Sequence, residues 1–262
     1  MTSDCTLPAS LLHSLQNVVG FTNVSTDFER CTSYGVDALG IGHRADAVVF
    51  PNSTGQVADI LNLCNASEVS VTPRGAGTGY TGGAVPVNGG IVLAFDHFNR
   101  ILEIDKSNLL AIVQPNVVTG TLQQAVERIG LFYPPDPASL NRSVIGGNVA
   151  ENAGGPRAFK YGTTKRYVLG LEAVLPTGQI IRTGGKSVKN VVGYDLTNLL
   201  VGSEGTLAVV TEIILRLIPK PISRTTLYVG CQSIEQAIAA VDAIIASGVI
   251  PAALELIDAD CI

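Results

Sequence analysis

Short apolar runs separated by turn residues recur along most of the chain, and they predict a mixed α/β fold. Each run has the length of one or two strands and is bounded by Gly, Pro, Asn or charged residues. The runs lie at residues 46–50, 69–72, 91–95, 109–113, 168–175, 179–183 and 206–217. Pro176, Thr177 and Gly178 separate two of these runs, which indicates a β-hairpin.

A helical period replaces this pattern after Ser53. Apolar side chains recur there at Val57, Ile60, Leu61 and Cys64. This spacing places them on one face of a helix. Ser53 and Gln56 have the spacing of a capping box, so we expect the helix to begin at Ser53. Further helical stretches are predicted at 11–19, 121–129 and 233–247.

Residues 131–165 are rich in Pro, Gly, Asn and Ser and show no clear period. A loop of this length within a folded domain is usually functional or disordered. The apolar residues Val144, Ile145, Val149 and Phe159 favour an ordered, packed loop.

The pattern divides the chain into three parts. We predict an N-terminal helical segment at 1–45, a main domain at 46–222 with subdomains at about 46–115 and 116–222, and a further unit at 223–262. In this last unit, apolar runs at 225–230 and 250–257 flank the helix at 233–247, which predicts a β-α-β unit. About 40 residues is the lower size limit for independent folding. We therefore expect this sequence to be the front part of a longer protein or a truncated one, with a small terminal appendage as the alternative.

Composition narrows the class of protein. Of the 262 residues, 46% are hydrophobic and 15% are charged, which is enough apolar material for a real core. The formal net charge of −5 argues against a dedicated nucleic-acid-binding protein. No apolar run reaches the ~18 residues of a membrane span and no signal peptide is visible, so the expected location is cytoplasmic. The five cysteines are scattered without a CxxC pair, so neither a disulfide framework nor a metal site is expected.

The segment from Pro73 to Gly83 has the strongest chemical signal. Within it, Gly77–Gly82 satisfies the G-x-G-x-x-G pattern of dinucleotide-binding Rossmann folds. That fingerprint requires a helix directly after the loop. Residues 84–90 contain a proline and two glycines and lead into another strand, so the Rossmann interpretation fails.

The same loop can bind a diphosphate in another way. Successive backbone amides in conformations that glycine permits converge on an anion, and the missing Cβ atoms allow close approach. The hydroxyl groups of Thr78 and Thr81 add donors. Small-residue segments recur at 134–137, 143–148, 152–155, 193–196 and 202–206, which suits a long, thin ligand lying along the backbone.

Several longer stretches resemble one known family. They are PRGAGTGYTGGA (73–84), NRILEID (99–105), YPPDPAS (133–139), SVIGGNVAENAGGPRAFKYG (143–162), GGKSVKNVVGYDLTNLLVGSEGTLAVVTEI (184–213) and PAALELID (251–258). In this order they resemble the FAD-binding domain of the vanillyl-alcohol oxidase and p-cresol methylhydroxylase (PCMH) superfamily. Within it, the sequence is most similar to the FAD-linked subunit of glycolate oxidase and to D-lactate and D-2-hydroxyacid dehydrogenases.

The resemblance implies an α+β fold: a PCMH-type FAD-binding domain of two α/β subdomains at 46–222, followed at 223–262 by the start of an incomplete α+β cap. It also implies a set of cofactor-binding residues. These are Pro73, Arg74, Gly75, Ala76, Gly77, Thr78, Gly79, Tyr80, Thr81, Gly82, Pro135, Asp136, Ser139, Ser143, Ile145, Gly146, Gly147, Asn148, Asn152, Ala153, Gly154, Tyr161, Gly162, Glu204, Gly205, Thr206 and Val210. Ala208 stands where the family usually has glycine. Some members tether FAD through His or Cys, and neither occurs within 65–96 or 98–230, so we expect non-covalent FAD.

The implied activity is oxidation of a small 2-hydroxy acid such as glycolate or D-lactate. An iron–sulfur or second flavoprotein subunit is the implied electron acceptor, and such partners would be the route to attachment at the inner membrane. In similar enzymes the catalytic base and the carboxylate clamp come largely from the cap, so we name no catalytic residue. Two alternatives stay open: a non-catalytic FAD-binding subunit or fragment that needs a partner or cap, and an NADPH-dependent reductase of the peptidoglycan-precursor type.

Overall fold

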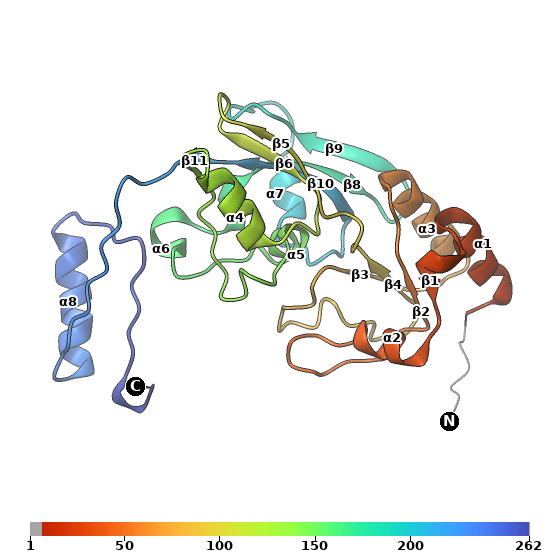
Figure 1. Ribbon diagram of the computed structural model, residues 1–262, viewed down its shortest axis with the longest axis horizontal. Coiled ribbons are helices and arrows are strands. Elements are labelled where there is room, and N and C mark those ends of the chain that lie inside the picture. Colours follow the sequence, from red (N-terminus) through yellow and green to blue (C-terminus); the bar gives the residue numbers. More distant parts are fainter. Residues whose placement is uncertain (1–6, 262) are drawn as a thin grey trace.

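The computed structural model describes residues 7–261, and two sheets dominate it (Figure 1). The strands are β1 (Val24–Ser25), β2 (Ala47–Val49), β3 (Val71–Arg74), β4 (Ile91–Ala94), β5 (Ile101–Asp105), β6 (Leu110–Val113), β7 (Leu131–Phe132), β8 (Val168–Val174), β9 (Ile180–Gly184), β10 (Val209–Arg216) and β11 (Ile218–Pro219). The helices are α1 (Ala9–Val19), α2 (Phe28–Ser33), α3 (Thr54–Ala66), α4 (Thr119–Glu127), α5 (Ile145–Glu151), α6 (Ala158–Tyr161), α7 (Leu196–Leu200) and α8 (Ile234–Ala246). Short 3₁₀ turns lie at Phe21–Asn23, Thr164–Tyr167 and Ala259–Cys261.

The first sheet has the strand order β1-β2-β4-β3, in which β2, β4 and β3 are parallel and β1 is antiparallel. Parallel strands need a crossover connection, and α3 makes the one from β2 to β3. The side chain of Ser53 caps α3 by accepting from the Gln56 amide at 3.3 Å, as the capping pattern predicts. The apolar stripe of α3 is buried with α1 against this sheet.

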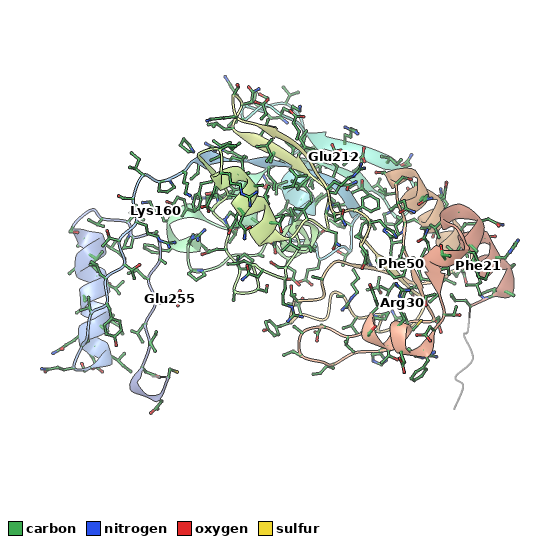
Figure 2. All side chains as sticks on the ribbon, viewed as in Figure 1. Phe21, Arg30, Phe50, Lys160, Glu212 and Glu255 are labelled. Atoms are coloured by element: carbon green, nitrogen blue, oxygen red, sulfur yellow. The ribbon has the colours of Figure 1, made fainter. Side chains whose placement is uncertain are left out.

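An aromatic cluster covers the other face of the first sheet. The Phe50 ring is T-shaped to Tyr34 at 5.5 Å. The Arg30 guanidinium lies 4.5 Å from the Phe50 ring centre, and both of these residues are labelled in Figure 2. The Tyr34 hydroxyl donates to Asp96 at 2.9 Å. This cluster fixes the loops near residues 34–37 beside the carboxyl ends of the parallel strands.

The second sheet is antiparallel, with the order β5-β6-β10-β8-β9. Burial alternates along β10, so one face of this strand is in the core. Buried residues of α4 and α5 belong to the same apolar cluster as this face. The predicted hairpin at 168–183 is confirmed as β8 and β9.

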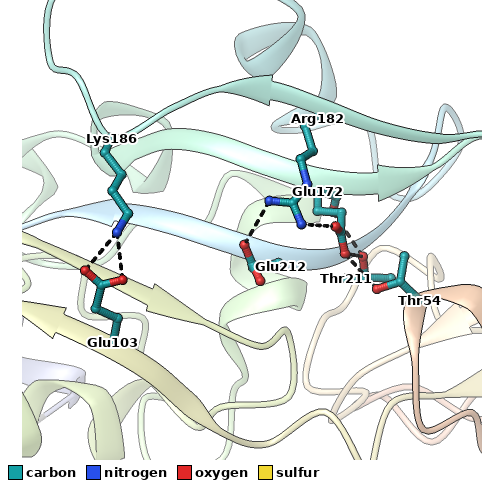
Figure 3. A network of polar contacts seen from close by, with 7 residues as sticks. All are labelled: Thr54, Glu103, Glu172, Arg182, Lys186, Thr211 and Glu212. Atoms are coloured by element: carbon teal, nitrogen blue, oxygen red, sulfur yellow. Dashed lines mark hydrogen bonds and ion pairs between the residues drawn. The ribbon is translucent and has the colours of Figure 1, made fainter.

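The two sheets meet at the ends of β8 and β10. Val174 and Val209 belong to the apolar core under the first sheet. Beside them, the Glu172 carboxylate accepts from the hydroxyls of Thr54 at 2.7 Å and Thr211 at 3.1 Å and pairs with Arg182 (Figure 3). Side chains of α3 and of the second sheet therefore fix the junction.

The C-terminal part differs from its prediction. Residues 223–261 lie apart from the two sheets in Figure 1, and α8 forms but buries none of its side chains. The strands predicted at 225–230 and 250–257 do not form among the described residues. A strand is stable only when it pairs with a neighbour, and these segments have no described pairing partner.

Tertiary pairing also changed three predictions inside the main domain. Residues 131–165 hold α5 and α6, so the small-residue segment at 143–148 leads into a short helix. Strand β3 includes Pro73, which is tolerated because β3 is an edge strand.

The predicted subdomain limit at 115/116 does not match the sheets, because β5 and β6 lie before it and belong to the second sheet through the pairing of β6 with β10. The outer limits at 45/46 and 222/223 stay predictions.

Among residues 7–261, no helix combines the length and the apolar character needed to cross a bilayer. The same residues contain no group of three or more His, Cys, Asp or Glu side chains arranged to hold a metal ion.

Candidate functional site

A cleft opens where the loop after β3 meets α5 and the loop that precedes β10. Many residues predicted from the sequence line it together. They are Pro73, Arg74, Gly75, Ala76, Gly77, Thr78, Gly79, Thr81, Ser139, Ser143, Gly146, Gly147, Asn148, Ala153, Glu204, Gly205 and Val210. Segments far apart in the sequence thus form one surface.

The glycine loop is the segment from Gly75 to Gly83, and most of its backbone N–H groups are available as hydrogen-bond donors. From Ala76 to Gly83, no N–H group donates a hydrogen bond within the described part of the chain. Residues 76–79 and Gly82 are partly buried, whereas Tyr80, Thr81 and Gly83 are exposed. Partly buried amides are normally paired, so the unpaired ones indicate a ligand that accepts from them. An anion such as a diphosphate fits this requirement.

Two glycines allow the close packing that forms the cleft. A Cβ at Gly75 would overlap a methyl group of Val144, and a Cβ at Gly146 would overlap the ring of Pro115. The amides of Ile145 and Gly146 donate to Val117 at 2.9 Å and to Pro115 at 2.7 Å. These contacts fix the start of α5 against the segment after β6.

Arg74 stabilises the loop from behind. Its Nη1 donates to the carbonyls of Val36 at 2.6 Å and Ala84 at 3.4 Å, and its guanidinium lies 5.7 Å from the Tyr34 ring centre. Burial lowers the pKa of Arg74, although nearby anionic groups oppose this. The guanidinium therefore holds the two ends of the glycine loop in place.

A buried polar network lies under α5. Asn148 Nδ2 donates to the Thr119 hydroxyl at 2.7 Å, and that hydroxyl lies 3.0 Å from the hydroxyl of Ser143. All three residues are buried. Thr119 was not among the predicted site residues, yet it orients two side chains that line the cleft. Its signal in sequence is weak, because a threonine at the start of an amphipathic helix is common.

Other lining residues were not among the named cofactor-binding residues, although several lie in the small-residue segments found from the sequence. They are Gly83, Ala84, Phe95, Pro115, Pro137, Val144, Ala150, Glu151, Leu200, Ser203, Ala208 and Val209. Most are neighbours of predicted residues, so their contribution depends on the direction of each side chain. The pattern in sequence does not set that direction.

Ten predicted residues do not line the cleft. They are Tyr80, Gly82, Pro135, Asp136, Ile145, Asn152, Gly154, Tyr161, Gly162 and Thr206. Ile145 is buried in the core, and the Tyr161 ring packs on Phe132 at 5.8 Å. Asp136 pairs with Arg157 Nε at 3.0 Å, and its pKa is raised by burial against the opposing effect of Arg157. Thr206 lines an adjoining hollow. Contact of these residues with FAD stays a prediction.

Comparison with known proteins identifies the class. The FAD binding domain family matches residues 45–184, and the C-terminal domain of FAD linked oxidases matches residues 220–262. The chain belongs to the FAD binding domain family, which confirms the resemblance and FAD as the cofactor.

The individual relatives agree with this class. Glycolate oxidase subunit GlcD of Bacillus subtilis (strain 168) is 54% identical over 213 residues, which cover 81% of this chain and 45% of that protein. D-lactate dehydrogenase of Anaerostipes hadrus is 42% identical over 219 residues, covering 84% of this chain and 46% of that protein. The chain thus spans less than half the length of these curated relatives.

Solved structures confirm the predicted fold class. Alkyldihydroxyacetonephosphate synthase has a TM-score of 0.79 at 21% identity, covering 95% of this chain and 47% of that chain. Substrate-bound p-cresol methylhydroxylase has a TM-score of 0.78 at 21% identity, covering 90% and 48%. The fold is therefore the mixed α/β fold of the PCMH type.

Proposed function

We propose that this chain is the FAD-binding part of an oxidoreductase that acts on a small 2-hydroxy acid such as glycolate or D-lactate. The run of unpaired amides from Ala76 to Gly83 along the cleft carries the proposal. The relatives named as a glycolate oxidase subunit and a D-lactate dehydrogenase support the substrate class.

The chain's own residues would hold the cofactor in an extended form. The loop from Gly75 to Gly83 would bind the diphosphate through its N–H groups. The cleft-lining Ser143 and Asn148, oriented by Thr119, would lie along the ribityl side. When bound, FAD supplies the acceptor for oxidation of a CH–OH group to a carbonyl.

We propose that the cofactor is held without a covalent bond. Cys64 is buried, and it does not line the cleft. His97 packs edge-to-face on Phe50 at 6.2 Å, in the aromatic cluster of the first sheet. Neither side chain is thus placed at the cleft surface.

The same proposal includes an electron-acceptor partner and a cellular location. The relative named as a subunit supports a second protein as electron acceptor, and an iron–sulfur or second flavoprotein subunit would supply the required one-electron or two-electron chemistry. A cytoplasmic location, with attachment to the inner membrane only through such partners, completes the proposal.

The first test is FAD binding. The purified chain should quench flavin fluorescence on titration with FAD, and acid should release all the flavin into solution. Flavin that stays on the denatured protein would refute non-covalent binding. Absence of binding would refute the proposed site.

The second test is flavin reduction without oxygen. D-lactate or glycolate should bleach the visible flavin absorbance of this chain, or of this chain joined to the C-terminal half of the Bacillus subtilis relative. Bleaching of the joined protein alone would favour an FAD-binding part that depends on a cap. Bleaching by NADPH but by neither acid would refute the substrate class.

A further inference from the structure

Two carboxylates face the cleft that we assign to the diphosphate. Glu151 is the last residue of α5, and Glu204 lies in the loop before β10. Among the described lining residues, Arg74 is the only basic one, and its guanidinium is bound to carbonyls behind the loop. The side chains of the cleft therefore add negative charge where an anion is expected.

The backbone holds these carboxylates as neighbours. The Glu204 amide donates to the Ala150 carbonyl at 2.8 Å, and the Gly202 amide donates to Val149 at 2.9 Å. Glu204 has φ +54° and Asn152 has φ +52°. Non-glycine residues rarely adopt this left-handed conformation, and it persists where the surroundings impose it.

Glu151 also touches the glycine loop. A Cβ at Gly79 would overlap its Oε1, so the carboxylate lies against the backbone of that loop. Glu151 forms no hydrogen bond or ion pair among the described residues, although it lines the cleft. The other charged side chains that line the cleft are Glu204 and Arg74, and the Arg74 guanidinium is bound to the Val36 and Ala84 carbonyls. Burial raises the pKa of Glu151, and the Glu204 carboxylate raises it further. The C-terminal end of α5 also disfavours an anion.

We infer that Glu151 takes up a proton when the diphosphate of FAD binds to the glycine loop. The inference rests on the proposed position of the cofactor. Two ionised phosphates next to Glu151 add like charges, which favour its neutral form. A neutral Glu151 keeps its contact with Gly79 and gains an O–H that can donate to a phosphate oxygen.

The inference predicts a dependence of FAD affinity on pH. Between the pKa values of Glu151 in the free and the bound protein, binding consumes one proton. In that range the Kd for FAD rises by up to tenfold for each unit of pH. Below both values the affinity is constant, because Glu151 is already neutral in the free protein.

The experiment measures the Kd for FAD by fluorescence quenching from about pH 5.5 to about pH 8.5 in the whole chain, in Glu151→Gln and in Glu29→Gln. Glu29 is an exposed residue of α2 and does not line the cleft, so it is the matched control. Glu151→Gln should bind FAD more tightly at high pH and should lose most of the slope, whereas Glu29→Gln should behave as the unaltered chain. Circular dichroism checks that each variant is folded.

Calorimetry gives an independent readout. Titration of FAD in two buffers with different ionisation enthalpies should show proton uptake by the unaltered chain and little uptake by Glu151→Gln. Equal pH slopes in both proteins, or loss of the slope only in Glu204→Gln, would overturn the assignment to Glu151. Lack of FAD binding by every variant at every pH would instead refute the cofactor site, and this inference with it.

Discussion

The hydroxyl of Thr54 donates a hydrogen bond of 2.7 Å to the carboxylate of Glu172, 118 residues later in the chain. Thr54 is the first residue of α3, which covers the first sheet, and Glu172 lies on β8 in the second sheet. The Glu172 side chain is only 12% exposed. The bond therefore joins α3, which packs on the first sheet, to the second sheet at the junction shown in Figure 3.

Thr54→Val keeps the shape of the side chain and removes this donor. A largely buried carboxylate then loses one of its partners, and we expect the free energy of unfolding to fall by about 1–3 kcal/mol. Urea unfolding measures the change. Thr22→Val, at an exposed threonine, is the control and should change little. Equal effects of the two substitutions would show that the junction bond contributes nothing.

Gly77→Ala tests the conformation of the glycine loop. Gly77 has φ +62°, and a Cβ there would overlap the Arg74 guanidinium. A left-handed backbone costs a non-glycine residue about 1–2 kcal/mol, so the Kd for FAD should rise about 5- to 30-fold.

Gly83→Ala is the matched control in the same loop. Gly83 lines the cleft without a left-handed φ, and the nearest atom to its added Cβ is Thr81 Oγ1 at 3.9 Å. FAD titration of both variants should separate them. A larger loss of affinity in Gly83→Ala would contradict the role of the Gly77 conformation.

Thr119→Val removes the centre of the polar network under α5. The Asn148 amide then loses its acceptor in a buried site, so we expect a loss of about 1–3 kcal/mol of stability and weaker FAD binding. Thr119→Ser keeps the hydroxyl and should retain FAD affinity. Urea unfolding and FAD titration measure the two effects, and identical behaviour of the two variants would exclude the hydroxyl as the cause.

Cys64 tests the packing of α3. Burial raises the pKa of its thiol from its ordinary value of 9.0 to about 11, which lowers the reactive thiolate fraction at neutral pH by about 100-fold. Iodoacetamide should modify the exposed Cys231 in the folded protein and Cys64 only after unfolding. Mass spectrometry of the peptides measures this, and equal rates would show that α3 opens readily.

Local patterns predicted much of the fold. The cap at Ser53, the hairpin at 168–183 and the helix α8 depend on neighbouring residues, so their sequence signals are sufficient. The helix α5 was missed because Gly146 and Gly147 suppress a helical signal, and contacts with Pro115 and Val117 supply what propensity lacks.

The residues of the candidate site also divide into those that the sequence could predict and those that it could not. The glycine loop could be found from its sequence, since the need for close backbone approach leaves a dense run of glycines. Thr119 and Glu151 could not be found, because their contribution depends on which distant segment they face.

The sequence by itself determined the class of this protein, because its glycine-rich segments resemble, in their order, those of an FAD-binding domain, and the family match confirms this. The tertiary structure decided how those segments meet, with β5 and β6 in the second sheet, Glu172 at the junction and Glu151 against Gly79. The physical reason is the separation along the chain over which each effect acts. Propensity, capping and backbone freedom act between near neighbours in the chain, whereas pairing, burial and charge act between residues that only folding brings together.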